Sequence, residues 1–269
     1  MFDMTASPAD LTSYDVILIN TSGGKDSQAM LSYVHELAAA VGIADRLVAV
    51  HADLGRVEWP GTAELAETQA AAYGIRFVKV SRPQGDLLAH IEQRGMFPSS
   101  TTRYCTSDHK RGQIRKVMTA LADEHRAAGG GRVRILNCMG LRREESPARA
   151  RRVEFVPEGP ASNGRRRVDE WSPIIDWSTA DVWDTIRSSG LPHHPAYDAG
   201  MPRLSCTFCV LASRSALVRA AQLAPELAAE YAAVEDRIDH RFNHKLSMAE
   251  IIAAAAVSET PVEVSAWAA

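Results

Sequence analysis

The sequence lacks any long run of apolar residues. Its longest apolar stretch falls far short of the roughly 20 residues that a helix needs to span a bilayer, which argues against a membrane-spanning protein. The first residues, MFDMTASPADLTSYD, have neither a basic start nor an apolar centre, so they do not predict a secretory signal. Together these absences predict a cytoplasmic protein with no membrane partner.

Cysteine and net positive charge are also scarce. The chain has four cysteines, at dispersed positions, in 269 residues. Without an export signal, such cysteines favour metal ligation or catalysis over disulfides. The formal net charge of -3 excludes a global basic surface, so any contact with nucleic acid must be local.

What the sequence does contain is a regular alternation of strand and helix patterns. Short runs rich in Val, Ile and Leu predict buried strands at 16–20, 47–51, 76–80 and 133–137. Helical patterns occupy 28–41, 63–73, 84–94 and 110–126. This alternation predicts βαβ units. We therefore expect an α/β fold: a doubly wound, mainly parallel sheet with a C-terminal helical extension.

The chain is expected to divide into three parts. Residues 1–14 are predicted to be a flexible N-terminus, 15–212 the α/β domain, and 213–269 an Ala-rich helical extension that frays near Pro261. Within the domain, Ser178 followed by Asp181 predicts the start of a helix over 179–188, because this spacing suits a capping box.

A glycine-rich loop directly follows the first predicted strand and reads Ser22-Gly23-Gly24-Lys25-Asp26-Ser27. In an open α/β sheet, ligands bind at the carboxyl ends of strands. Glycines let backbone N–H groups turn toward an anion, and the next helix adds its positive end. With the Lys25 cation and two serine hydroxyls, the loop suits a polyphosphate; a tight turn with a helix cap is the alternative. Asp26 is costly there unless it caps the helix or meets Mg²⁺.

Further loops after predicted strands are expected at the same edge of the sheet. Ala52-Asp53-Leu54 follows the second strand, where Asp53 can serve Mg²⁺ or a ribose, unless this segment is a simple turn. After a later strand, Gly140 permits close approach of a backbone, and Arg142 can bind a phosphate through two hydrogen bonds. Lys110 is expected to reach the same anion.

The loop sequence SGGKDS resembles the pyrophosphate loop of the N-type ATP pyrophosphatases, or adenine nucleotide alpha hydrolases, which adenylate a substrate and release pyrophosphate. Further segments resemble the phosphoadenosine-phosphosulfate reductase branch of that superfamily. They are HADLGRVEWPGT at 51–62, TTRYCTSDHKR at 101–111, GLRREES at 140–146 and a long match at 172–209. The resemblance covers residues 15 to 215 and implies that the backbone of 52–54 pairs with adenine.

Two departures from the reductases favour ATP over a sulfonucleotide as the substrate. The assimilatory reductases carry a degenerate first loop, whereas this chain keeps the full motif. They also end in a motif with a nucleophilic cysteine, and no cysteine follows Cys209 here. We therefore expect cleavage of ATP to AMP and pyrophosphate, with catalytic residues Lys25, Asp26, Lys110 and Arg142.

The cysteines predict a metal centre. Cys206 and Cys209 are separated by two residues, which suits one metal ion or one edge of a cluster. The cluster-bearing reductases pair this motif with tandem cysteines, of which the chain has only Cys105. A [4Fe–4S] cluster on these three is predicted, with Cys138 or an external ligand as the fourth. The alternatives are a buried core role for Cys138, and zinc or a persulfide-carrying thiol for the set.

With its full first loop and its cysteines, the chain resembles the ATP-pyrophosphatase component of DNA phosphorothioation systems. This resemblance implies a cysteine desulfurase as sulfur donor and a nucleic acid, DNA before others, as acceptor, directly or through a partner protein. Eight arginines in 142–167 offer phosphate contacts, unless that segment is a mobile loop. The other functions considered are tRNA thiolation, assimilatory sulfonucleotide reduction and a non-catalytic, nucleotide-sensing iron–sulfur subunit.

Overall fold

The computed structural model describes residues 10–258, which form two compact units. The first unit contains residues up to 52, 63–80 and 114–193, and the second contains 53–62, 81–113 and the chain from 194. Most of the predicted flexible N-terminus and the fraying near Pro261 lie outside the described residues. The described part of that N-terminus is ordered by burial, since Leu11 and Tyr14 pack into the core of the first unit.

The first unit is built on a six-stranded sheet with the order β3-β2-β1-β4-β6-β5. Its strands are β1 (Val16–Thr21), β2 (Leu47–Asp53), β3 (Arg76–Ser81), β4 (Val133–Met139), β5 (Phe155–Val156) and β6 (Arg166–Trp171). Strand β1 pairs in parallel with β2 and β4, and β4 with β6, whereas β5 runs antiparallel to β6. The predicted mainly parallel α/β sheet is confirmed.

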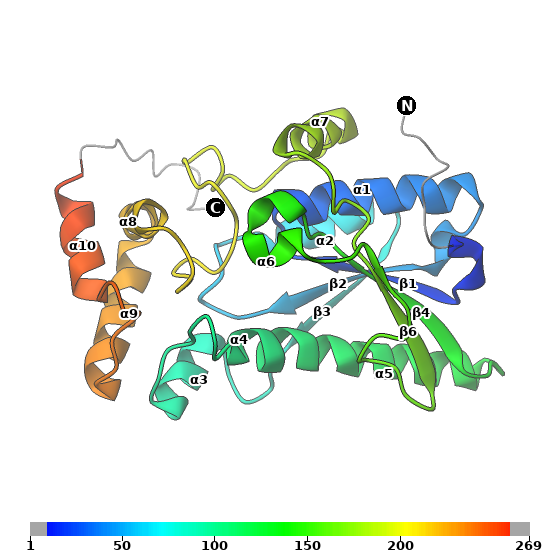
Figure 1. Cartoon of the computed structure of the whole chain (residues 1–269), viewed down its shortest axis with the longest axis horizontal. Helices are drawn as coiled ribbons and strands as arrows, with labels where there is room; N and C mark the ends of the chain where they lie inside the picture. Colours follow the sequence, from blue (N-terminus) through cyan, green and yellow to red (C-terminus); the bar gives the residue numbers. More distant parts are fainter. Residues whose placement is uncertain (1–9, 259–269) are drawn as a thin grey trace. The chain divides into compact units, whose positions relative to one another are not determined.

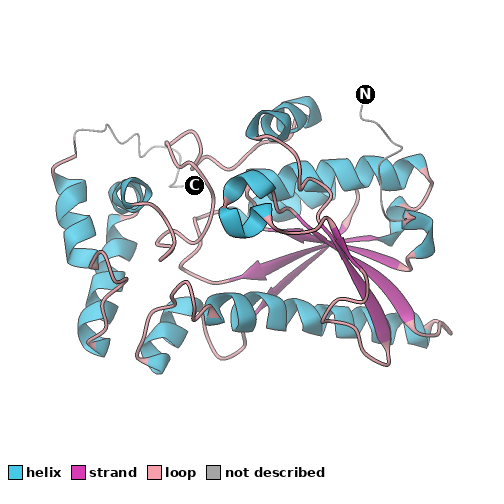
Figure 2. Ribbon diagram, in the orientation of Figure 1, coloured by secondary structure: helices cyan, strands magenta, loops and turns pink. Residues whose placement is uncertain are grey.

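Helices cover both faces of this sheet (Figure 1). The helices of the unit are α1 (Lys25–Ala40), α2 (Thr62–Ala72), α5 (Gly112–Ala127), α6 (Pro147–Ala150) and α7 (Thr179–Ser189). On one face, α1 and α2 pack on apolar side chains of β1, β2 and β4; on the other, α5 packs on the opposite side chains of the same strands. Figure 2 shows the strands between these two helical layers.

The order of the strands creates a switch point between β1 and β4. The chain runs outward from β1 through β2 to β3, then returns to place β4 on the other side of β1. The loops that follow β1 and β4 therefore leave the same edge in opposite directions, and such a crevice is where open α/β sheets bind ligands. The glycine-rich loop and Arg142 follow β1 and β4, respectively.

The second unit is helical. It contains α3 (Leu87–Arg94), α4 (Tyr104–Thr106), a π-helical turn (Ser107–Arg111), α8 (Arg214–Leu223), α9 (Pro225–Ile238) and α10 (Met248–Ala256). The sequence predicted a division at residue 212, but the contacts divide the chain elsewhere. The reason is that the C-terminal helices share one apolar core with α3, with Leu54 and Trp59, and with Phe208 of the cysteine loop.

Local sequence signals explain most element boundaries. Ser178 and Asp181 form the predicted capping box at the start of α7, with the Ser178 hydroxyl accepting the Asp181 N–H. Strands β5 and β6 were not predicted, because β6 reads Arg-Arg-Val-Asp-Glu-Trp and lacks an apolar run. Within residues 10–258, no helix combines the length and apolar character needed to cross a membrane.

Candidate functional site: an anion loop at the switch point

The glycine-rich loop is a closed turn between β1 and α1. Gly23 has a φ of 68°, a left-handed conformation that glycine adopts without strain. The Ser27 hydroxyl donates to the Gly24 carbonyl at 2.8 Å and accepts the Ser22 N–H at 3.0 Å. Ser27 therefore locks the loop, and Lys25 and Asp26 begin the first turn of α1, where the helix dipole favours an anion.

Gly140 allows the loop after β4 to lie against this turn. A methyl group at residue 140 would lie 3.0 Å from the Asp26 carbonyl oxygen and 3.1 Å from the Ser27 Cα, closer than side-chain carbons normally approach a backbone. The close approach expected at Gly140 is therefore to the α1 backbone. It sets the distance at which Arg142, two residues later, meets Asp26.

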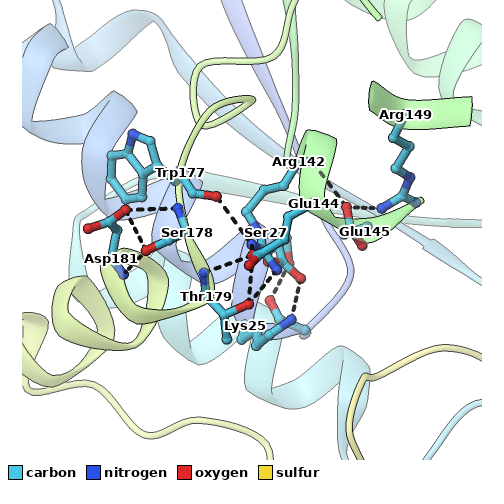
Figure 3. Close-up of polar contacts among 12 residues, drawn as sticks. Lys25, Ser27, Arg142, Glu144, Glu145, Arg149, Trp177, Ser178, Thr179 and Asp181 are labelled. Carbon is cyan, nitrogen blue, oxygen red and sulfur yellow. Dashed lines mark hydrogen bonds and ion pairs between the residues drawn. The ribbon is translucent and has the colours of Figure 1, made fainter. Parts of the chain in front are cut away.

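Asp26 lies between two cations, Lys25 and Arg142, both of which are labelled in Figure 3. One carboxylate oxygen accepts from Lys25 Nζ at 2.8 Å and the other from Arg142 Nε at 2.6 Å. The side chains of Lys25 and Arg142 are only 7% and 3% exposed, respectively, and that of Asp26 is 16% exposed. Two largely buried cations are thus held together at a helix N-terminus, where their N–H groups suit a phosphate, while Asp26 balances part of their charge.

The Arg142 guanidinium is fixed from its other side. It donates to Glu144, to the Trp177 carbonyl at 3.2 Å and to the Thr179 hydroxyl at 3.2 Å. Burial acts to lower the pKa of Arg142, but Asp26 and Glu144 outweigh it and raise that pKa. Hydrogen bonds from Arg142 and Thr179 lower the pKa of Glu144. Arg142 is thus a permanently charged, oriented donor.

Residues of the motif around Arg142 also hold the loop after β4 in its conformation. The Glu145 carboxylate accepts the Arg142 backbone N–H at 3.0 Å and pairs with Arg149. Ser146 caps α6 by accepting the Arg149 N–H at 3.2 Å. The sequence identified Arg142 but missed Glu144 and Thr179, although both lie in the matching segments 140–146 and 172–209, because their contacts with Arg142 and with each other depend on how α7 packs against the loop.

The second predicted loop is a local turn. Asp53 accepts the Gly55 N–H at 2.7 Å, and the Leu54 carbonyl accepts the Leu87 N–H at 3.1 Å. Ala52 ends the first unit, while Asp53 and Leu54 begin the second. These contacts agree with the simple-turn alternative, and the Leu54 carbonyl already accepts a hydrogen bond within the protein. The proposed contacts of Ala52, Asp53 and Leu54 with adenine or ribose stay a prediction.

Three of the four cysteines lie together in the second unit. Burial raises the pKa of the Cys206 thiol to about 12; the Lys110 charge acts against this shift, and Cys209 and Cys105 add to it. The Cys206–Cys209 loop is anchored by the Thr207 N–H, which donates to the Val57 carbonyl at 2.9 Å. All four cysteines are free thiols, as predicted. Lys110 lies beside this cysteine group, and its contact with a phosphate stays a prediction.

The spacing of these thiols distinguishes between metal centres. Thiolates on one tetrahedral zinc lie about 3.8 Å apart, because Zn–S bonds are about 2.3 Å long. In the part of the chain that the structure describes, the sulfur atoms of Cys105, Cys206 and Cys209 are not all within 4.8 Å of one another. They therefore do not form a ready zinc site. A cluster binds each thiolate through a different iron and suits a wider spacing.

Cys138 does not join this group. Its side chain is fully buried on the α1 face of β4, in the apolar core with Ile19, Leu136 and Trp171. Burial alone raises the pKa of its thiol far above the usual range. This burial agrees with the core-residue alternative for Cys138, because an apolar core stabilises a neutral thiol over a thiolate; its ligand role stays a prediction.

A histidine pair next to the cysteine segment was missed by the sequence analysis. His90 Nδ1 lies 3.0 Å from His109 Nε2, and the His90 ring meets Tyr104 edge-on. His109 is fully buried in the π-helical turn. A single buried histidine carries no pattern in a sequence, so nothing in the residue spacing could have paired these two.

The fold defines the chain as a mainly parallel α/β protein with a glycine-rich loop at its switch point. The family model described as "Phosphoadenosine phosphosulfate reductase domain" matches residues 16–212. The chain therefore belongs to the phosphoadenosine phosphosulfate reductase family, as its motifs predicted. Enzymes of this family process nucleotides in sulfur chemistry.

Individual relatives are more distant. An uncharacterized 37.8 kDa protein of Escherichia phage 186 is 25% identical over 60% of this chain and 46% of its own length. Adenosine 5'-phosphosulfate reductase of Allochromatium vinosum is 30% identical over 60% of this chain and 57% of its own. The chain thus spans about half the length of these curated relatives. A crystal structure of phosphoadenylyl-sulfate reductase from Candida auris aligns with a TM-score of 0.46 at 15% identity, over 73% of this chain and 84% of that one.

Proposed function

We propose that the protein is an ATP pyrophosphatase that adenylates an acceptor so that sulfur can be inserted. The observation that carries this proposal is the complete Ser22–Ser27 loop at the switch point, with Lys25 and Arg142 converging on one buried carboxylate. Two oriented cations and a helix N-terminus suit the dense charge of a β,γ-pyrophosphate, which ATP has and a sulfonucleotide lacks.

The proposed reaction is a displacement at the α-phosphorus of ATP. An oxygen of the acceptor forms a bond to this phosphorus while the bond to the bridging oxygen of the β-phosphate breaks, and the electron pair leaves with pyrophosphate. Lys25 and Arg142 stabilise the charge that develops on the leaving group. In a second displacement, the terminal sulfur of the donor's persulfide forms a bond to the activated atom of the acceptor while the bond to the adenylated oxygen breaks, and the electron pair leaves with AMP. A thiol reductant then cleaves the S–S bond to the donor.

Mg²⁺ fits this site through Asp26, because hard divalent cations prefer carboxylate oxygens. When bound, the ion would supply charge neutralisation for the polyphosphate. The residues of the chain do the remaining work. Ser27 holds the loop closed, Gly140 sets the approach of the β4 loop, and Glu144 orients the Arg142 guanidinium.

The cofactor proposed for the second unit is a [4Fe–4S] cluster held by Cys105, Cys206 and Cys209, with the fourth ligand from outside the chain. The observations that support it are the grouping of these three thiols and the burial of Cys138 in the apolar core of the first unit. A bound cluster would supply an iron-based site for sulfur chemistry. Lys110, whose charge acts to lower the Cys206 pKa, would favour the thiolate that a cluster requires.

DNA is the acceptor we propose, with a cysteine desulfurase as the sulfur donor, as in DNA phosphorothioation. Sulfonucleotide reduction is the second candidate, and the family membership and the reductase relatives favour it. Against this candidate stand the full first loop and the absence of any cysteine after Cys209 in these 269 residues.

The test is the product of ATP turnover. With Mg²⁺, the protein should convert ATP to AMP and pyrophosphate. Replacement of Lys25 by alanine removes a charge-assisted contact worth about 1.5–3 kcal/mol, so the rate should fall roughly 10- to 100-fold. Lys79→Ala, at an exposed position of β3, is the matched control. Formation of ADP and phosphate, or unchanged turnover in Lys25→Ala, contradicts the proposal.

A further inference from the structure

The arginines of segment 142–167 divide into two groups. Six of the eight have partners within the fold. These are Arg142 with Asp26 and Glu144, Arg143 with Asp176, Arg149 with Glu145, Arg165 with Asp123, Arg167 with Asp169, and Arg166 with the Ala161 carbonyl and the Thr119 hydroxyl. The segment is therefore an ordered part of the first unit, and most of its positive charge is used internally.

Arg151 and Arg152 form the second group. Both are exposed, and among residues 10–258 neither side chain has an ion pair or hydrogen bond. They directly follow α6, and Val153 beside them is 63% exposed. Arg151 and Arg152 thus place two adjacent guanidinium groups, without an ion pair in the described residues, next to an exposed apolar side chain.

No nearby carboxylate is free to neutralise these two cations. Of the acidic residues in 142–156, Glu144 is held by Arg142 and Thr179, and Glu145 by Arg149 and a backbone N–H. The third, Glu154, accepts the Trp171 indole N–H at 3.0 Å. Glu144 and Glu145 are thus paired with other arginines, and in the described part of the chain none of the three acids forms an ion pair with Arg151 or Arg152.

The backbone below these two arginines is fixed to the anion site. The Arg152 N–H donates to the Arg149 carbonyl at 2.9 Å, and the Arg143 guanidinium donates to the Arg152 carbonyl at 3.2 Å. Arg149 in turn pairs with Glu145, which accepts the Arg142 backbone N–H at 3.0 Å. A ligand held by Arg151 and Arg152 is therefore held on the same rigid loop as Arg142.

From this arrangement we infer that Arg151 and Arg152 form a contact surface for the phosphodiester backbone of DNA, with Val153 against the sugar. The inference rests on the proposed function, because it names where the acceptor polymer binds. Arginine suits this ligand, since its planar fork matches a phosphate and its charge displaces counterions from the duplex. A monomeric anion would instead bind the enclosed site at Arg142.

The test compares two double variants in duplex DNA binding, measured by fluorescence anisotropy of a labelled oligonucleotide over a series of salt concentrations. In Arg151→Gln/Arg152→Gln, two phosphate contacts are lost. Affinity at low salt should fall roughly 10-fold, and the slope of log K against log salt should become shallower by about 2. The control, Lys79→Gln/Arg126→Gln, removes two exposed cations of β3 and α5 and should bind like the unmodified protein.

The outcomes separate this inference from the proposed function. Equal losses in the two double variants, an unchanged affinity in Arg151→Gln/Arg152→Gln, or no DNA binding by the unmodified protein overturns the surface. A loss confined to a structured RNA of equal length overturns its assignment to DNA. Pyrophosphate release from ATP, measured on the same samples without DNA, reports on the proposed function alone and should be equal in all three proteins.

Discussion

Asp26 is the residue on which the charge balance of the anion site depends. Its two oxygens engage Lys25 at 2.8 Å and Arg142 at 2.6 Å. The carboxylate therefore already neutralises the cations that an incoming phosphate needs. An anion that arrives without a metal meets the negative charge of Asp26 at close range, and the low local dielectric makes that repulsion costly. Asp26 thus favours anions that arrive with a compensating cation.

Replacing Asp26 by asparagine should increase the affinity for metal-free pyrophosphate by roughly 10-fold, about 1.4 kcal/mol. The carboxamide keeps the shape of the side chain but removes the charge that competes with the ligand. Isothermal titration calorimetry with pyrophosphate in the presence of a chelator measures this change. Asp181→Asn, which alters a first-turn acid of α7, serves as the control, and equal affinities in the two variants contradict the role assigned to Asp26.

At the scale of elements, the segment from α4 through the π-helical turn places a histidine where it stays neutral. His109 is fully buried, and no hydrogen bond to its Nδ1 is found in the described part of the chain. Burial, followed by the charges of His90 and Arg82, lowers the pKa of His109 to about 4. Burial, with Arg82, also lowers the pKa of His90. Burial thus favours the uncharged form of both imidazoles, His109 in the turn and His90 on α3.

The free energy of unfolding should fall as the pH drops from 6.5 to about 4. In this window the unfolded chain binds a proton at residue 109, with a pKa near 6.5, whereas folded His109 does not. Linkage then removes up to about 3 kcal/mol of stability. Urea unfolding at several pH values measures the slope. It should be shallower in His109→Gln than in His244→Gln, at an exposed position; equal slopes exclude His109 as the cause.

At the scale of the whole molecule, the two units carry different chemistry. The anion site belongs entirely to the first unit, and the three grouped cysteines belong to the second. The C-terminal helices contribute to the second, because α8, α9 and α10 complete the core into which Phe208 of the cysteine loop packs. Phosphate binding and the metal centre should therefore be separable by mutation.

Anaerobic preparation should give a brown protein with broad visible absorption and bound iron. Cys206→Ser should lose both the colour and the iron, because it removes one of three grouped thiols. Cys138→Ala should keep both, since that side chain lies in the apolar core of the first unit. Elemental analysis together with visible spectra checks the prediction. If the protein contains stoichiometric zinc and no iron, the centre is a zinc site and not a cluster. If Cys138→Ala loses iron, Cys138 is a ligand.

The chain should not release sulfite from a sulfonucleotide in the presence of reduced thioredoxin. Reductive release needs a free thiolate to attack sulfur. Here burial raises the pKa of the Cys138 thiol, and the other three cysteines are the ligands we propose for a cluster. The assay supplies adenylylated sulfate, with or without a 3′-phosphate, and measures sulfite. Turnover near or above about 1 s⁻¹, the low end for working enzymes, establishes the reductase instead.

The sequence by itself determined the framework and the phosphate loop. Strands β1 to β4 were predicted because each is short and rich in Val, Ile, Leu or Phe, the pattern of a strand in a covered sheet. The glycine-rich loop was recognisable because its function depends on neighbouring residues, from Ser22 to Ser27. The start of α7 was predicted for the same reason, since its cap needs only residues 178 and 181. Features that depend only on neighbouring residues can therefore be predicted from the sequence.

Only the tertiary structure decided which charges and thiols meet. Strand β6 is buried although it reads as charged, and its Asp169 accepts a hydrogen bond from Tyr14, which lies 155 positions away along the chain. The Asp26–Arg142 pair joins residues 116 positions apart. The pleat of β4 places Cys138, a predicted ligand, on the apolar face. These outcomes depend on partners distant in sequence, and no local pattern encodes which distant group will lie opposite.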